Sequence, residues 1–154
     1  MPDDVAAAII ALVHHADAVG PDVDPQRPLS AAGRRQAEWL AEHARAAGLR
    51  PAAIWHSGKL RARQTAEAFL GACNPFAEFK AMRGLRPDDA PDWIRDVLEE
   101  QSASVLIVSH MPLLPALLRR LVPDAANFPL HGMVVIERTD ERYVERWRIE
   151  PPAR

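Results

Sequence analysis

The chain has 154 residues, of which 48% are hydrophobic and 26% charged, and its formal net charge is -2. This is an ordinary globular composition with enough chain to bury one core, and the small net charge gives no overall attraction to nucleic acid or anionic lipid. No apolar run is long enough for a membrane span, and the first residues lack the positive region of a secretory signal. The single cysteine, Cys73, excludes an internal disulfide. We therefore expect residues 1–154 to form one domain in the cytoplasm.

The hydrophobic pattern predicts strands that alternate with helices along the chain. Strands are expected over residues 6–13, 52–56, 104–108, 132–138 and 143–150, and helices over residues 31–47, 59–71, 93–101 and 112–121. Residues 74–91 are expected to be mostly irregular. Such alternation predicts a three-layer α/β/α sandwich, with a mostly parallel central sheet, helices on both faces and a C-terminal β-hairpin.

Two of the predicted strands end in histidine. The first delivers His14 and His15, and residues 104–108 are followed by Ser109 and His110. Ligands of open α/β sheets bind at the carboxyl ends of the strands. The sequence therefore predicts one site, built from both ends of the chain at this edge of the sheet.

Four short motifs share an order and spacing with a known family. They are residues 12–18 (Leu-Val-His-His-Ala-Asp-Ala), 27–37 (Arg-Pro-Leu-Ser-Ala-Ala-Gly-Arg-Arg-Gln-Ala), 57–66 (Ser-Gly-Lys-Leu-Arg-Ala-Arg-Gln-Thr-Ala) and 108–112 (Val-Ser-His-Met-Pro). Together they resemble the histidine phosphatase superfamily, also called phosphoglycerate mutase-like. The short length and the Asp-Ala after the first motif resemble its SixA-type phosphohistidine phosphatase branch. The resemblance spans nearly the whole chain, and the third motif is its most specific part.

The resemblance implies a phosphatase that works through a phosphohistidine intermediate. His15 aligns with the nucleophilic histidine, and Arg61 and His110 complete the predicted catalytic set. The phosphate is expected to contact Arg61, His110, His14 and Ser57. The chemistry is plausible on physical grounds, because a neutral imidazole nitrogen can attack phosphorus while a fixed guanidinium stabilises the equatorial oxygens.

The sequence also departs from the family pattern. The arginine before the nucleophile is replaced by His14, and the usual proline after Ser57 is replaced by Gly58. The glutamate that many members use as general acid is missing from residues 82–89, where Asp88, or its neighbour Asp89, is a candidate proton donor. Because His14 is neither always charged nor bidentate, we expect a weak phosphatase whose activity rises toward mildly acidic pH.

Several alternatives remain open at this point. The expected substrate is a phosphohistidine on a protein or a small phosphate ester, with no cofactor, no nucleic acid and no membrane, in a monomer or weak dimer. The altered first motif also fits an inactive module that binds a phosphorylated partner. A metal site at His14, His15 and His110 is a third interpretation. His43, His56 and His131 are expected to lie outside the site.

Overall fold

The computed structural model describes residues 8–140 and 142–152. Its elements, in chain order, are β1 (Ala8–His14), α1 (Ala31–Ala46), β2 (Ala53–His56), α2 (Leu60–Cys73), β3 (Glu78–Ala81), α3 (Pro91–Glu99), β4 (Val105–Ser109), α4 (Leu113–Leu121), β5 (Met133–Arg138) and β6 (Tyr143–Ile149). The predicted α/β/α sandwich is confirmed.

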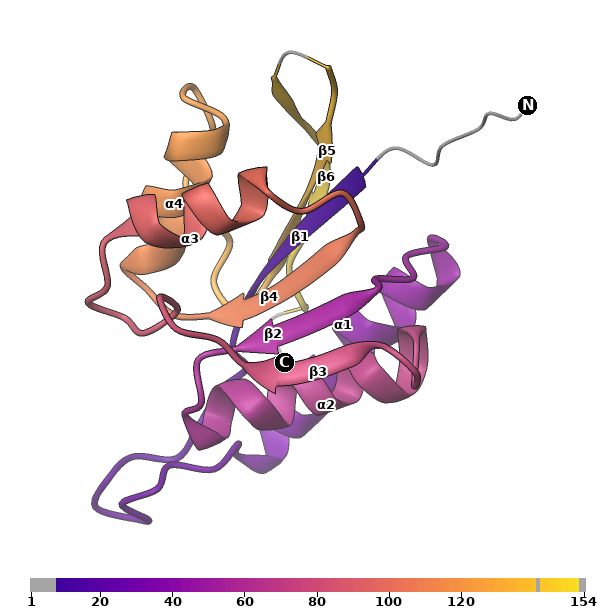
Figure 1. The fold of residues 1–154 in the computed structure, drawn as a ribbon. Helices are drawn as coiled ribbons and strands as arrows, with labels where there is room; N and C mark the ends of the chain where they lie inside the picture. Colours follow the sequence, from indigo (N-terminus) through magenta and orange to yellow (C-terminus); the bar gives the residue numbers. More distant parts are fainter. Residues whose placement is uncertain (1–7, 141, 153–154) are drawn as a thin grey trace.

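The six strands form one sheet in the order β3-β2-β4-β1-β5-β6. Strands β1 to β4 are parallel, β5 runs antiparallel to β1, and β6 closes the predicted hairpin. Figure 1 shows the four parallel arrows pointing to the side where the long loop after β1 lies. The carboxyl ends of β1, β2 and β4 therefore meet at this edge.

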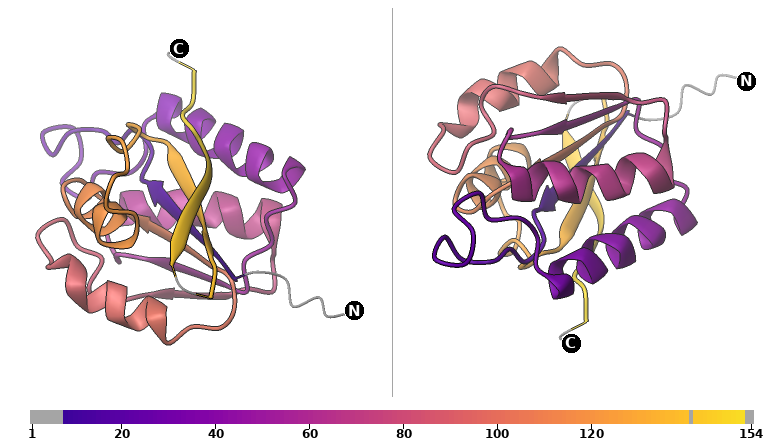
Figure 2. Two further views of the ribbon diagram at one scale, coloured as in Figure 1. Left: turned by 90° about the horizontal axis from the view of Figure 1, so that it is seen from above. Right: turned by 90° about the horizontal axis from the view of Figure 1, so that it is seen from below.

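Alternating strand residues pack against two different helical layers (Figure 2). On one face, Ile10 and Leu12 of β1 pack in a cluster with α3 and α4 residues such as Ile94 and Leu117. On the other face, Ala11 packs in a cluster with residues of α1 and α2. Both clusters are nearly solvent-free, so the strands are fixed from both sides and their ends are held in place.

The structure refines the sequence analysis at several element boundaries. Residues 74–91, expected to be mostly irregular, also contain β3, a four-residue edge strand that pairs in parallel with β2. Only Phe79 and Ala81 of this strand are apolar, so its own pattern is weak and the pairing decides its conformation. Pro112, expected inside the first helical turn, instead caps α4, which begins at Leu113. Residues 6 and 7 of the predicted first strand lie outside the described residues.

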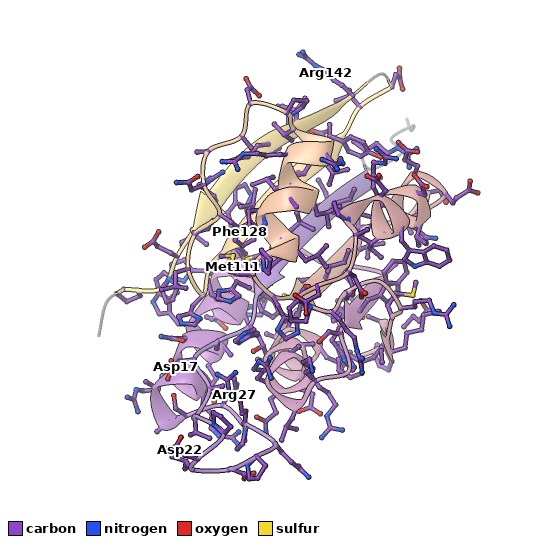
Figure 3. The ribbon with its side chains drawn as sticks, turned by 90° about the vertical axis from the view of Figure 1, so that its left-hand side faces the viewer. Asp17, Asp22, Arg27, Met111, Phe128 and Arg142 are labelled. Atoms are coloured by element: carbon purple, nitrogen blue, oxygen red, sulfur yellow. The ribbon has the colours of Figure 1, made fainter. Side chains whose placement is uncertain are left out.

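The segments that follow the parallel strands gather at one end of the molecule. Figure 3 shows Asp17 and Arg27, from the loop after β1, on the same side as Met111, while Arg142 of the hairpin lies at the opposite end.

Within the described ranges, no helix is long and apolar enough to cross a membrane.

Candidate active site

His15 lies immediately after β1, and the structure fixes which of its ring nitrogens carries the proton. Its backbone N–H donates to the carbonyl of Ser109 at 3.1 Å, continuing the pairing of β1 with β4. Its Nδ1–H donates to the carbonyl of Ala16 at 2.8 Å. The neutral ring therefore keeps a lone pair on Nε2, which is the nitrogen that can attack an electrophile.

His110 lies beside His15, with ring centroids 4.9 Å apart and the planes inclined by 56°. Its Nε2 is 2.7 Å from the hydroxyl of Ser57, which also accepts the backbone N–H of Lys59. If Ser57 donates its own proton to Nε2, His110 carries its proton on Nδ1. That Nδ1 atom is buried and has no hydrogen-bond partner among the described residues.

Arg61 comes from the first turn of α2, where backbone N–H groups and the helix dipole favour an anion. Its Nε is also buried without a partner among the described residues. Burial, and then the charge of Arg27, lower the pKa of Arg61. One buried polar atom of Arg61 and one of His110, whose ring lies 4.9 Å from that of His15, thus have no partner among the described residues. Leaving buried donors unpaired is costly, so both atoms fit a role in binding an anion.

Thr65 connects Arg61 to the end of β1. Its hydroxyl donates to the carbonyl of Arg61 at 2.8 Å and accepts the backbone N–H of Ala16 at 3.0 Å. The side chain of Thr65 is fully buried. One hydroxyl therefore fixes the separation between the first turn of α2 and the segment that carries His15.

The loop between β1 and α1 is held by the start of α1. Ser30 caps α1 by accepting the N–H of Gly33, and its hydroxyl donates to Asp17 at 2.6 Å. The Gln36 side chain accepts the N–H of Asp17 at 2.9 Å. A Cβ at Gly33 would lie 1.9 Å from the Asp17 carbonyl, so this contact requires glycine.

Arg27 lies near enough to the site for its charge to act on three site residues. It has a positive φ of 52°, and its Nε donates to the Val19 carbonyl at 2.9 Å. Its charge lowers the pKa values of His15, Arg61 and His110. The side chain of Gln64 accepts the N–H of Leu29 at 2.8 Å and so attaches this loop to α2.

His14, expected to contact the phosphate, is buried and contacts His131. Its Nδ1 accepts the backbone N–H of His131 at 2.8 Å, and the two rings stack with centroids 4.9 Å apart and planes at 2°. The ring also lies 4.5 Å from that of His15. Nδ1 is therefore an acceptor, and the neutral ring carries its proton on Nε2.

All three histidines at the centre of the site are neutral at physiological pH. Burial, followed by the charge of His15, lowers the pKa of His14 to about 2. Burial lowers the pKa of His15 to about 4, with the bond to Ala16 opposing this and Arg61 adding to it. Burial and then His15 lower the pKa of His110 to about 3. His14 therefore stays neutral in mildly acidic solution in the free protein, because the ring is desolvated and its Nδ1 already accepts a hydrogen bond. An activity that rises toward mildly acidic pH stays a prediction.

His131, which the sequence analysis placed outside the site, is part of this cluster. Its Nδ1–H donates to the His15 carbonyl at 2.9 Å, in addition to the backbone bond to His14. The available signal was topological: β5 is antiparallel to β1, so the residues just before β5 lie beside the end of β1. A histidine at that position can therefore reach the strand end, although no local motif marks it.

A cavity of about 350 Å³ adjoins Ser57 on the side of residues 81–89. Asp89 lines it, together with Arg83 and Arg86, and its carboxylate accepts the N–H of Arg86 at 2.9 Å. Asp88 is exposed. Asp89 and Ser57 thus line the same cavity, which Asp88 does not.

The remaining candidate residues lie in surroundings that indicate structural roles. Ser109 is fully buried and donates to the Leu85 carbonyl at 2.6 Å, as an orienting residue would. His56 is buried and accepts the N–H of Gly58, while His43 is exposed on α1 against Trp39. Cys73 is the buried last residue of α2, and burial raises the pKa of its thiol to about 11.

The metal interpretation finds no support in this geometry. Within the described part of the chain, no three His, Cys, Asp or Glu side chains converge to hold a metal ion. Nδ1 of His14 and Nε2 of His110 are engaged by His131 and Ser57.

Comparison with known proteins identifies the family. The profile of the histidine phosphatase superfamily (branch 1) matches residues 14–93, which is more than half of the chain. This chain belongs to that superfamily. The match includes His15 and Arg61, while His110 and His131 lie beyond it. No curated protein sequence matches the chain significantly.

Solved structures share the whole fold. The protein histidine phosphatase SixA complexed with tungstate is 24% identical, covers 93% of this chain and 97% of its own, and has a TM-score of 0.82. A protein assigned as the phosphohistidine phosphatase SixA of Agrobacterium tumefaciens is 25% identical, with coverage of 95% and 99% and a TM-score of 0.79. One from Nakamurella multipartitia, assigned in the same way, is 22% identical, with coverage of 96% and 98% and a TM-score of 0.76. The resemblance to this superfamily and to its SixA-type members is confirmed.

Proposed function

We propose that this protein is a phosphohistidine phosphatase in which His15 is the nucleophile. The observation that carries the proposal is the state of His15: its Nδ1–H is donated to Ala16, its Nε2 keeps a lone pair, and its pKa of about 4 keeps it neutral at physiological pH. Family membership supports hydrolysis of phosphate compounds, and the similarity to SixA structures supports phosphohistidine as the substrate class.

The reaction proceeds in two displacements. The Nε2 lone pair of His15 forms a bond to phosphorus as the bond to the leaving nitrogen or oxygen breaks, giving a phosphohistidine on the enzyme. Water then attacks phosphorus, the N–P bond breaks, its electron pair returns to His15, and phosphate leaves. Arg61 and the Nδ1–H of His110 stabilise the charge on the equatorial oxygens. This role is supported by their buried polar atoms without partners among the described residues, by the ring of His110 beside that of His15, and by the charge of Arg61 acting on His15.

Asp89 is our candidate for protonating the leaving group, in place of Asp88. It lines the cavity next to Ser57, whose hydroxyl contacts His110, whereas Asp88 is exposed. Substitution Asp89→Asn should slow a substrate with a poor leaving group more than p-nitrophenyl phosphate, and Asp88→Asn serves as the matched control. Equal effects of the two substitutions would remove Asp89 from the mechanism.

The deciding experiment measures hydrolysis of p-nitrophenyl phosphate and of a phosphohistidine peptide by wild type and His15→Ala. Turnover that disappears in the variant, with a preference for the peptide, supports the proposal. Turnover that survives the substitution excludes His15 as nucleophile. Binding of phosphate without any turnover would instead indicate a module that recognises a phosphorylated partner, which the replacement of the family arginine by His14 also allows.

A further inference from the structure

His131 contacts both residues of the histidine pair through separate groups. Its backbone N–H donates to Nδ1 of His14 at 2.8 Å, and its own Nδ1–H donates to the His15 carbonyl at 2.9 Å. Its ring stacks almost parallel to that of His14. His131, 116 positions from His15 in the sequence, therefore constrains the ring of His14 and the backbone of His15.

The backbone at His131 has an uncommon conformation. Its φ is +55°, in the left-handed region that few residues other than glycine adopt, asparagine, aspartate and histidine being the most frequent of them. The next residue is tightly packed, since a Cβ at Gly132 would lie 2.5 Å from the Ile149 carbonyl. Such strain persists where surrounding contacts determine the backbone, and it is typical of functional sites. The turn before β5 is thus a rigid support for the end of β1.

We propose that His131 is a positioning residue: its backbone N–H keeps the proton of His14 on Nε2, and its side chain holds the backbone that orients His15. His14 then offers one fixed, neutral N–H donor where the family has an arginine. The functional consequence rests on the proposed role of His15 as nucleophile, whereas the hydrogen-bond assignment does not.

Three substitutions at His131 distinguish the loss of its side-chain N–H donor from a disturbance of the backbone fold. Asparagine places an N–H donor close to the position of the histidine Nδ1 and tolerates a positive φ. Aspartate has the same shape without the donor, and glycine accepts the backbone conformation with no side chain. We expect His131→Asn to retain a kcat close to wild type. We expect His131→Asp and His131→Gly to lose kcat by about 10-fold to 10²-fold, because misplacing a reacting group has effects of this size.

Separate measurement of kcat and KM distinguishes a lost positioning contact from electrostatic repulsion of the substrate. Repulsion of a phosphate by the new aspartate raises KM, whereas the neutral His131→Gly variant should lower kcat with little change in KM. Thermal unfolding of all three variants shows whether they fold. Equal kcat in the Asn, Asp and Gly variants, each folded, would overturn the proposal.

A spectroscopic measurement tests the hydrogen bonds without turnover. Long-range ¹H–¹⁵N correlation spectra at neutral pH report which ring nitrogen of His14 carries the proton. The backbone N–H of residue 131 is kept in every substitution, so we expect the Nε2–H tautomer of His14 in wild type and in all three variants. A protonated Nδ1 in wild-type His14 would refute the assignment. If the protein proves to have no phosphatase activity, the proposed function fails, and these spectra still decide whether the backbone N–H of residue 131 keeps the proton of His14 on Nε2.

Discussion

The β1 side of the site, with His14 and His15, differs from the opposite side, with Arg61 and His110, in how its polar atoms are paired. On the β1 side, Nδ1 of both histidines and the carbonyl of His15 have partners within the protein. On the opposite side, Nε of Arg61 and Nδ1 of His110 are buried without partners among the described residues.

The difference indicates two tasks. In the proposed mechanism the attacking group, His15, is fixed before substrate arrives, because each of its hydrogen bonds is made to backbone or to a packed side chain. In the same mechanism the other side keeps donors available for the charge that develops, which is the arrangement that stabilises a transition state. Thr65 joins the two sides through Ala16 and the Arg61 carbonyl.

The largest expected effect on activity comes from removing the guanidinium of Arg61. Arg61→Ala should lower kcat/KM by about 10²- to 10³-fold, the usual effect of losing one transition-state donor. Steady-state kinetics with a phosphohistidine peptide measures it. Arg63→Ala is the matched control, because Arg63 is an exposed member of the same helix paired with Glu67, and its loss should leave kcat/KM unchanged. Similar losses in the two variants would mean that Arg61 acts only through the general charge of α2.

A substitution at Gly33 tests how firmly the β1 side is held. A Cβ there would overlap the Asp17 carbonyl, so Gly33→Ala should destabilise the protein by about 1–3 kcal/mol and reduce activity by displacing the loop after β1. Gly71→Ala, in α2, has open space and should be neutral or stabilising by up to about 1 kcal/mol. Urea unfolding of both variants measures the free energies, and a Gly33→Ala protein as stable as wild type would show that the loop can shift.

Thr65 tests the link between the two sides. Thr65→Val keeps the shape but leaves the buried N–H of Ala16 unpaired, so we expect about 1–3 kcal/mol of destabilisation and a lower kcat. Thr65→Ser keeps the hydroxyl and should restore most of both. If the valine variant unfolds at the same urea concentration as wild type, the Ala16 N–H must find another partner.

The depressed histidine pKa values predict a pH dependence of stability. The unfolded chain takes up protons at these histidines below about pH 6.5, while His14, His15 and His110 stay neutral in the folded protein down to about pH 2, 4 and 3. Their stabilising contribution is therefore complete above pH 6.5 and decreases as the pH falls. Lowering the pH from 7 to 5 should reduce the free energy of unfolding, by roughly 1–2 kcal/mol for each histidine that remains neutral. Urea unfolding midpoints at the two pH values test this, and an unchanged midpoint would argue against buried neutral rings.

The alternation of apolar runs determined the elements and the layer order, because period-2 and period-3.6 patterns report which residues face a core. The strand ends predicted that His15 and His110 belong to one region, since parallel strands end at one edge, and the resemblance to the family added Arg61. The structure places the rings of His15 and His110 4.9 Å apart, and the charge of Arg61 acts on His15. Their catalytic roles stay predictions.

Tertiary structure alone decided the state of the histidines and brought the turn before β5 beside them. His14 looked like a titrating substitute for an arginine, but burial and the N–H of His131 make it a neutral donor. Strand β3 forms because β2 offers it an edge, although its own pattern is weak. Protonation depends on desolvation and on partners distant in sequence, as for His14 and His131, and no local pattern records either of them.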